Sequence, residues 1–176
     1  MKTLVLGGIR SGKSAVAETH LAAAPSVTYI ACGPRADDAD WAARIAAHQA
    51  RRPAAWVTVE TTELSDILPH LAGPALVDCL GTWLTARLDA LGAWEAPREA
   101  WADALAAEVD ALAAAVTAAR HDVVLVSNEV GFTLVSEHRS GRIFADWLGI
   151  TNQAVAAVCD RVDLVVAGQV LTVKAP

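Results

Sequence analysis

Thr3-Leu-Val-Leu-Gly-Gly-Ile-Arg-Ser-Gly-Lys-Ser14 is the stretch that decides the fold of this chain. A short apolar run ends at Gly7, and Gly7-x-x-x-x-Gly12-Lys13-Ser14 has the spacing of a phosphate-binding loop between a strand and a helix. Glycines let consecutive backbone N–H groups point at one anion, and the helix adds its positive N-terminal end. The stretch therefore predicts a nucleotide site, followed by a helix from Lys13 to about residue 22.

The side chains of this loop have separate predicted roles. Lys13 can reach the β- and γ-phosphates of a nucleotide, and the Ser14 hydroxyl can ligate Mg²⁺. The alternative is a glycine-rich turn that binds nothing, but the loop, the strand before it and the helix after it all agree. The predicted nucleotide-binding residues here are Gly7, Gly8, Ile9, Arg10, Ser11, Gly12, Lys13 and Ser14.

Length and composition narrow the class of protein. A chain of 176 residues suits one domain, here expected to span 1–176. No apolar run reaches the ~20 residues of a membrane span, and no signal-peptide pattern precedes Leu4, so we expect a cytoplasmic protein. The net charge of −6 disfavours a nucleic-acid partner, and the three cysteines lack metal-ligand spacing.

The rest of the chain alternates predicted strands and helices. We expect strands at 27–31, 56–60, 75–78, 123–126, 162–166 and 170–174, and helices at 38–52, 63–72, 82–91, 98–119 and 151–159. This order predicts an α/β fold of the P-loop NTPase type, with a mostly parallel sheet flanked by helices and a C-terminal β-hairpin. The most hydrophobic strand, 123–126, is expected to be central.

Polar residues at the ends of these strands are candidate ligand contacts, because open parallel sheets bind ligands at their carboxyl edge. Backbone groups of Ala31, Cys32 and Gly33 are predicted nucleotide contacts, although a simple loop is about as frequent at such a place. Asp78 ends an apolar strand and is the candidate Mg²⁺ acid beside Ser14. Glu129 could position a metal-bound water or a substrate hydroxyl, or it could cap its own loop.

One histidine on the predicted helix 38–52 is surrounded by arginines. Arg44, His48 and Arg51 share a helix face, and Arg52 lies four residues after His48. A positive field favours the neutral imidazole, which is a competent nucleophile toward phosphorus, while guanidiniums bind phosphate. On spacing alone, a solvent-facing basic helix with an incidental histidine is somewhat more frequent.

Five blocks of the chain, spread over residues 2–174, resemble the bifunctional adenosylcobinamide kinase / adenosylcobinamide-phosphate guanylyltransferase family of cobalamin biosynthesis. The blocks are Gly7–Ser14, Arg44-Ile-x-x-His48 through Arg52-Pro-x-x-Trp56, Asp78-Cys-Leu-Gly-Thr-Trp-Leu84, Asn128-Glu-Val-Gly131, and Arg139-x-x-Arg142 with Asp146-x-x-Gly149-x-x-Asn152-Gln153. The chain departs from the family pattern at three positions, which are Gly81 for Thr, Ala86 for Asn and Ser136 for Pro.

The resemblance implies two linked reactions in one enzyme. Adenosylcobinamide is phosphorylated by ATP or GTP, and GMP then passes from GTP through guanylylated His48 to the phosphate, giving adenosylcobinamide-GDP and pyrophosphate. It also implies Mg²⁺ on Ser14 and Asp78, and a homo-oligomer, typically a trimer, with the substrate site shared between chains. The further nucleotide contacts that it implies are Arg51, Arg52, Glu60 and Leu80. From its position alone, Glu60 is equally an ordinary acid before a helix.

Two other functions fit the motifs when these are taken alone. The chain could be a kinase only, with a structural His48 and arginines that bind phosphate. It could also be a nucleotide-switched binding protein, although it lacks the Asn-Lys-x-Asp guanine motif of regulatory GTPases. Guanine preference is therefore expected only from the family resemblance.

Overall fold

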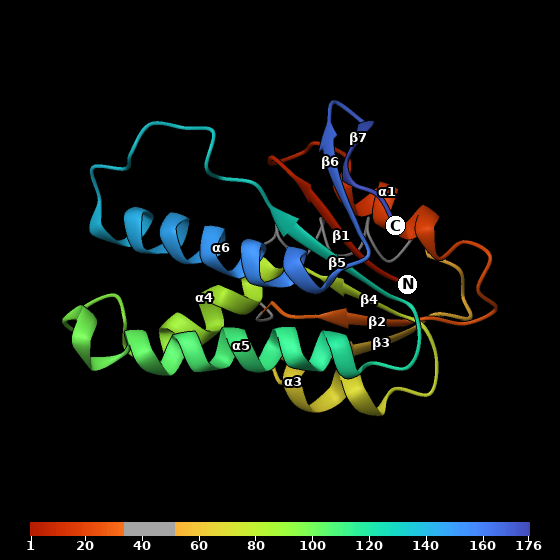
Figure 1. Cartoon of the computed structure of the whole chain (residues 1–176), viewed down its shortest axis with the longest axis horizontal. Coiled ribbons are helices and arrows are strands. Elements are labelled where there is room, and N and C mark those ends of the chain that lie inside the picture. Colours follow the sequence, from red (N-terminus) through yellow and green to blue (C-terminus); the bar gives the residue numbers. More distant parts are fainter. Residues whose placement is uncertain (34–51) are drawn as a thin grey trace.

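The computed structural model describes residues 1–33 and 52–176, so the expected helix 38–52, with Arg44, His48 and Arg51, lies outside the described residues. The described chain forms a seven-stranded sheet in the order β3-β2-β4-β5-β1-β6-β7 (Figure 1). Its strands are β1 (Lys2–Gly7), β2 (Thr28–Ala31), β3 (Val57–Glu60), β4 (Ala75–Asp78), β5 (Val123–Asn128), β6 (Arg161–Val166) and β7 (Gln169–Lys174). Neighbouring strands from β3 to β6 are parallel, and β7 is antiparallel to β6. The expected mostly parallel sheet with a C-terminal hairpin is confirmed.

The sheet is most apolar at its centre. β5 is the fourth of the seven strands, and its residues from Val123 to Val126 are buried, which confirms the expected central strand. Strands covered on both faces read as continuous apolar runs, as this one does. β1 lies between β5 and β6, and Gly7 is level with Asn128 and Val165. The predicted phosphate loop therefore leaves the sheet between two flanking strand ends.

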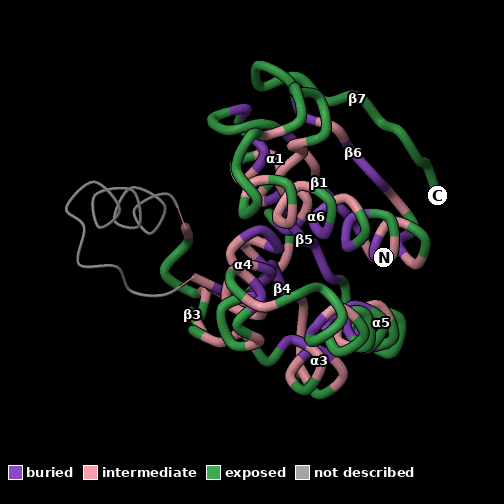
Figure 2. The backbone as a smooth tube through the Cα atoms, turned by 90° about the vertical axis from the view of Figure 1, so that its left-hand side faces the viewer, coloured by how far each residue is buried: buried purple, intermediate pink, exposed green. Residues whose placement is uncertain are grey.

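Helices cover both faces of the sheet (Figures 1 and 2). One face packs on α1 (Lys13–His20), through an apolar cluster that includes Val5, Ala17, Leu76 and Val126. The other face is covered by α3 (Leu64–Ile67), α4 (Leu80–Ala90), α5 (Ala102–Ala118) and α6 (Arg139–Val158), with short 3₁₀ turns at Leu68–His70 and Arg98–Ala100. Each fully buried leucine in this larger core contributes about 1.5–3 kcal/mol. The core lies mainly on the α4–α6 side.

Two of the expected helices differ clearly in extent or type from those in the structure. α6 begins at Arg139, twelve residues before the expected position of 151, so that expectation was wrong. Gly141 and Gly149 lie within the helix, and each lowers helix propensity by about 1 kcal/mol. Burial of Trp147 and Leu148 against the core outweighs this cost. The expected helix 63–72 becomes α3 and a 3₁₀ turn, with Pro69 early in the turn.

The last two strands are joined by a tight turn. Ala167 and Gly168 have φ values of 49° and 77°, and a pair of positive φ values suits the twist of a two-residue hairpin. The side chains of β7 are exposed along its whole length. Among the described residues, no helix is both long and apolar enough to cross a membrane.

Candidate nucleotide site

Two positions around the loop after β1 accept only glycine. Gly12 precedes α1 with a φ of 93°. A Cβ on Gly7 would lie 2.4 Å from Ser11 Oγ and 2.8 Å from the carbonyl oxygen of Val165, so no side chain fits there. The Ser11 N–H donates to the Gly8 carbonyl at 3.2 Å, which closes the loop. The chain is thus curled between strand and helix as the motif predicts.

Lys13 lies inside this curl. Only 7% of the residue is exposed, and its Nζ donates to the Gly8 carbonyl at 3.2 Å. Ser14 follows in the first turn of α1 and is half-buried. Ile9 is exposed, as are Gly8 and Arg10. The ammonium and the hydroxyl are therefore placed at the positive end of α1, where a bound polyphosphate would be neutralised.

Neighbouring strand ends brace the loop from both sides. The Glu129 N–H, just beyond β5, donates to the Gly7 carbonyl at 3.1 Å. The Gly168 N–H in the β6–β7 turn donates to the Ser11 carbonyl at 2.8 Å. The Glu129 carboxylate accepts from the Gly131 N–H at 2.6 Å, which matches the loop-cap alternative for this residue. The brace from the hairpin turn was not predicted, because no sequence signal links residues 11 and 168.

Asp78 lies at the end of β4, on the sheet face that carries α1. It lies two residues after Leu76, so the two share a sheet face, and Leu76 packs in the same apolar cluster as Ala17 of α1. Its Oδ2 accepts from the Tyr29 hydroxyl at 3.0 Å. A carboxylate and the Ser14 hydroxyl are hard oxygen donors, and Mg²⁺ commonly uses one or two carboxylates with water and phosphate oxygens. The donors present therefore fit Mg²⁺ that arrives with a nucleotide.

Arg52 lies over the ring of Tyr29, with its guanidinium carbon 3.6 Å from the ring centroid. Its Nη1 donates to the Thr58 hydroxyl of β3 at 3.1 Å. A guanidinium held by a ring face and a hydroxyl has a defined position at this edge of the sheet. Of the arginines that surround His48 in the sequence, Arg52 is the one that the structure describes.

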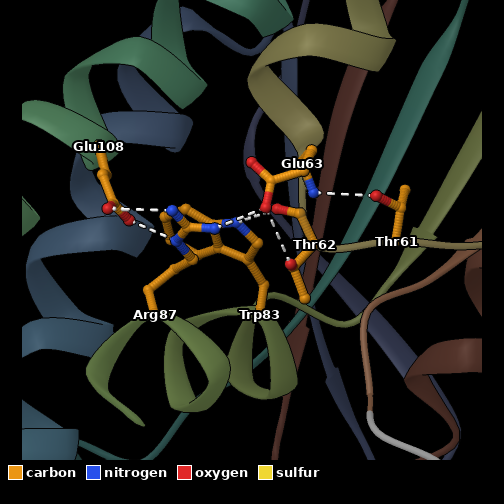
Figure 3. Close-up of polar contacts among 6 residues, drawn as sticks. All are labelled: Thr61, Thr62, Glu63, Trp83, Arg87 and Glu108. Atoms are coloured by element: carbon orange, nitrogen blue, oxygen red, sulfur yellow. Dashed lines mark hydrogen bonds and ion pairs between the residues drawn. The ribbon is translucent and has the colours of Figure 1, made fainter. Parts of the chain in front are cut away.

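Glu60 ends β3 and is exposed. It pairs in register with Ala31, and Ala31 pairs with Asp78, so three predicted site positions lie level at the carboxyl edge. The loop that follows Glu60 is fixed by two side chains of α4 (Figure 3). Trp83 Nε1 donates to the Thr62 carbonyl at 3.0 Å, and Arg87 Nη1 donates to Glu63 at 2.9 Å.

Arg87 also joins α4 to α5. Its Nε and Nη2 donate to the two carboxylate oxygens of Glu108 at 2.5 and 3.1 Å (Figure 3). Hydrogen bonding to Glu108, together with its charge and that of Glu63, raises the pKa of Arg87 despite partial burial. This bidentate ion pair ties the loop after Glu60 to the helical layer.

The predicted nucleotide contacts Cys32 and Leu80 belong to the apolar core. Cys32 is 1% exposed, and burial raises its thiol pKa, so the side chain is an unreactive core group. Leu80 is fully buried in the main core. The whole of each residue is buried, backbone included, so neither exposes surface for the predicted contact. Gly33 and Ala31 are half-buried at the same edge.

Gly81, one of the departures from the family pattern, occupies a crowded place. A Cβ there would lie 3.1 Å from Asn128 Oδ1 and 3.7 Å from the Phe144 ring. The missing side chain lets the Asn128 side chain approach the start of α4. The Asn128 carbonyl in turn accepts from Asn152 Nδ2 of α6 at 3.1 Å.

One polar cluster was missed in the sequence. Asp163 of β6 is fully buried and accepts from Arg161 Nε at 2.7 Å and from the Thr172 hydroxyl at 2.9 Å, while His20 Nε2 lies 3.0 Å from it. Burial favours a raised pKa, but these hydrogen bonds and the neighbouring positive charges outweigh it and lower the pKa of Asp163. The cluster ties the end of α1 to the hairpin. His20 lies 143 residues before Asp163 in the chain, so no local motif marks the cluster.

Comparison with known proteins agrees with this geometry. A solved type III secretion ATPase superimposes with a TM-score of 0.58 at 11% identity, covering 93% of this chain and 50% of that one, which shows similarity of fold alone. The bifunctional adenosylcobalamin biosynthesis protein CobU of Salmonella typhimurium is 41% identical over 99% of this chain and 100% of the relative. The corresponding CobP of Pseudomonas aeruginosa is 38% identical over 99% and 98%. The family model described as cobinamide kinase / cobinamide phosphate guanyltransferase matches residues 3–173, and the chain belongs to that family.

Proposed function

We propose that the chain phosphorylates adenosylcobinamide and then transfers GMP to the phosphate. The observation that carries this proposal is the phosphate loop with buried Lys13, which follows β1 at the same carboxyl edge of the sheet that Asp78 ends in β4, in a chain of this family. In the first reaction, the substrate hydroxyl attacks the γ-phosphorus of ATP or GTP and the nucleoside diphosphate leaves. In the second, a His48 ring nitrogen attacks the α-phosphorus of GTP and pyrophosphate leaves. The corrinoid phosphate then attacks the bound GMP and releases His48.

The described residues supply the electrostatics that both reactions need. Phosphoryl transfer depends on positioning and charge neutralisation more than on covalent chemistry by the protein. The negative charge of the polyphosphate would be neutralised by Lys13, by the N-terminal end of α1 and by Arg52. Mg²⁺, when bound at Ser14 and Asp78, neutralises phosphate charge and orients the oxygens. Glu60, at the same edge, would contact a base or ribose.

We also propose that the chain forms a homo-oligomer, with a trimer as the expected state. The exposed apolar side chains of Phe132, Leu134 and Val135 in the loop after β5, and those of β7, are surface that association would bury. Sedimentation analysis of the purified chain measures the state directly, and a monomer at micromolar concentration would exclude it.

The decisive test of the function is His48→Ala. We expect it to abolish GMP transfer and self-labelling by α-³²P-GTP, because the covalent intermediate cannot form. Phosphorylation of adenosylcobinamide should persist, because that reaction uses no protein nucleophile. In the parent, retained label that is acid-labile and base-stable would identify a phosphoramidate. His70→Ala, at an exposed histidine of the 3₁₀ turn, is the matched control and should retain both activities.

The two assays on one variant also separate the alternatives. If the parent forms adenosylcobinamide phosphate but never retains label, the chain is a kinase only. If His48→Ala transfers GMP at close to the parent rate, His48 is not the nucleophile. If the parent does neither, the proposed function is wrong.

A further inference from the structure

Tyr29 lies between the two charged groups at the β2–β4 edge of the site. Tyr29 is 5% exposed, and it packs in the apolar cluster between the sheet and α1. At one end, its hydroxyl donates to Asp78 Oδ2 at 3.0 Å. On one ring face, the Arg52 guanidinium carbon lies 3.6 Å from the centroid. One rigid side chain thus contacts both the candidate metal carboxylate and a candidate phosphate-binding cation.

The backbone fixes Tyr29 where it can make both contacts. Tyr29 is level with Leu76, and Asp78 is level with Ala31, so the phenol reaches toward the strand end from one pleat back on the same face. Arg52 is anchored from its other side by the Thr58 hydroxyl of β3 at 3.1 Å. A phenylalanine would fill the same apolar space, so packing alone does not explain a buried hydroxyl at this place.

The Tyr29 hydroxyl is the donor in its hydrogen bond with Asp78. Burial, followed by the negative charge of Asp78, raises the pKa of Tyr29, and the positive charge of Arg52 opposes this only in part. Its hydrogen bond to Asp78 Oδ2 fixes the orientation of the carboxylate oxygen atoms.

We propose that Tyr29 is a positioning residue for both ligand partners, orienting the Asp78 carboxylate toward a nucleotide-bound divalent cation and the Arg52 guanidinium toward nucleotide phosphate. The proposal rests on the proposed function, which places the metal at Asp78 and phosphate near Arg52. Hydrogen bonds to a metal-ligating carboxylate fix its geometry, and their loss costs about 10–100-fold in metal affinity. A guanidinium on an aromatic face gains a smaller stabilisation.

Two substitutions separate the two contacts. Tyr29→Phe removes the hydrogen bond to Asp78 but keeps the ring under Arg52. Tyr29→Leu removes both. Thr28→Val, at the preceding position of β2, is the matched control. Thermal unfolding of every variant checks that the site is folded, and Tyr29→Phe should fold normally because it keeps the ring in the apolar cluster.

The measurement is binding rather than turnover. The fluorescent N-methylanthraniloyl ester of guanosine 5′-[α,β-methylene]triphosphate is titrated without any corrinoid, once with Mg²⁺ and once with excess EDTA. The dissociation constant in EDTA divided by the dissociation constant in Mg²⁺ reports the contribution of the metal to binding. We expect Tyr29→Phe to lower this ratio about tenfold and to leave the EDTA value within about twofold. We expect Tyr29→Leu to weaken binding in EDTA as well, by about threefold.

Asp78→Asn distinguishes failure of this inference from failure of the proposed function. It should lower the ratio at least as much as Tyr29→Phe, and adding Tyr29→Phe to it should lower the ratio no further, because Tyr29 acts on the metal through Asp78. If Asp78→Asn leaves the ratio unchanged, the metal assignment itself is wrong. If Asp78→Asn lowers the ratio while Tyr29→Phe does not, Tyr29 has a packing role only and the inference is overturned.

Discussion

The two sides of the candidate nucleotide site are built in different ways. The phosphate loop uses consecutive residues, Gly7–Ser14, and holds its shape with backbone hydrogen bonds and a positive φ at Gly12. The opposite side uses Tyr29, Arg52 and Asp78, which come from β2, the segment before β3, and β4. A site made of consecutive residues can be recognised from spacing, whereas a site assembled across strands depends on the register of the sheet.

A single substitution on the phosphate-loop side should lower activity most, and Lys13→Ala tests this. Its ammonium is the buried point charge on the loop, so we expect kcat/KM to fall by about 10²–10³ or more in both reactions. The measurement is the kinetics of adenosylcobinamide phosphorylation and of GMP transfer. Lys174→Ala, at an exposed lysine of β7, is the matched control. Near-normal turnover by Lys13→Ala would show that the loop does not hold the reacting phosphates.

Asp163→Asn tests a region outside both sides of the site, and its effect should be on stability. Arg161, Thr172 and His20 surround the carboxylate. We therefore expect the substitution to lower the free energy of unfolding at pH 7, measured in urea, by about 2–3 kcal/mol.

The pH dependence of this loss follows from the direction of the pKa shift. The folded pKa lies below the ordinary value of 3.8, so the stabilisation is complete above that value and is lost as pH falls through the folded pKa. The parent and Asp163→Asn should therefore converge in acid. A difference that stays constant down to pH 2 would exclude this origin.

The smallest expected effect is at the ion pair that braces the dispersed side. Arg87→Met and Glu108→Gln should each lower stability by about 1 kcal/mol, with a coupling of similar size in the double variant. Denaturant unfolding of the four proteins gives the coupling. Arg87→Met should also raise KM for GTP modestly, because the loop after Glu60 loses its tie to Glu63. Additive effects of the two changes would show that the pair contributes nothing.

Features with local causes could be predicted from the sequence. The strand, glycine spacing and helix around Lys13 occur within one short segment, and the hairpin is marked by its turn at Gly168. The beginning of α6 could not be predicted, because Gly141 and Gly149 weaken the local signal while tertiary packing of Trp147 stabilises the helix.

Within the site, the difference has the same origin. Asp78 and Glu60 were found as polar residues at strand ends, where the parallel sheet collects them. Tyr29 reads in the sequence as one more aromatic residue of a buried strand, and only the pairing of β2 with β4 brings its hydroxyl to Asp78. Contacts set by register between distant strands leave no mark in local spacing.

The contact between the hairpin turn and the phosphate loop has a consequence for synthesis of the chain. The loop is translated well before Val165 and Gly168, which pack against Gly7 and Ser11. Both strands that flank β1 in the sheet, β5 and β6, are also translated after it. A nascent chain therefore carries the nucleotide motif long before it has a nucleotide site, and affinity for phosphate should emerge only when residues 161–168 have left the ribosome.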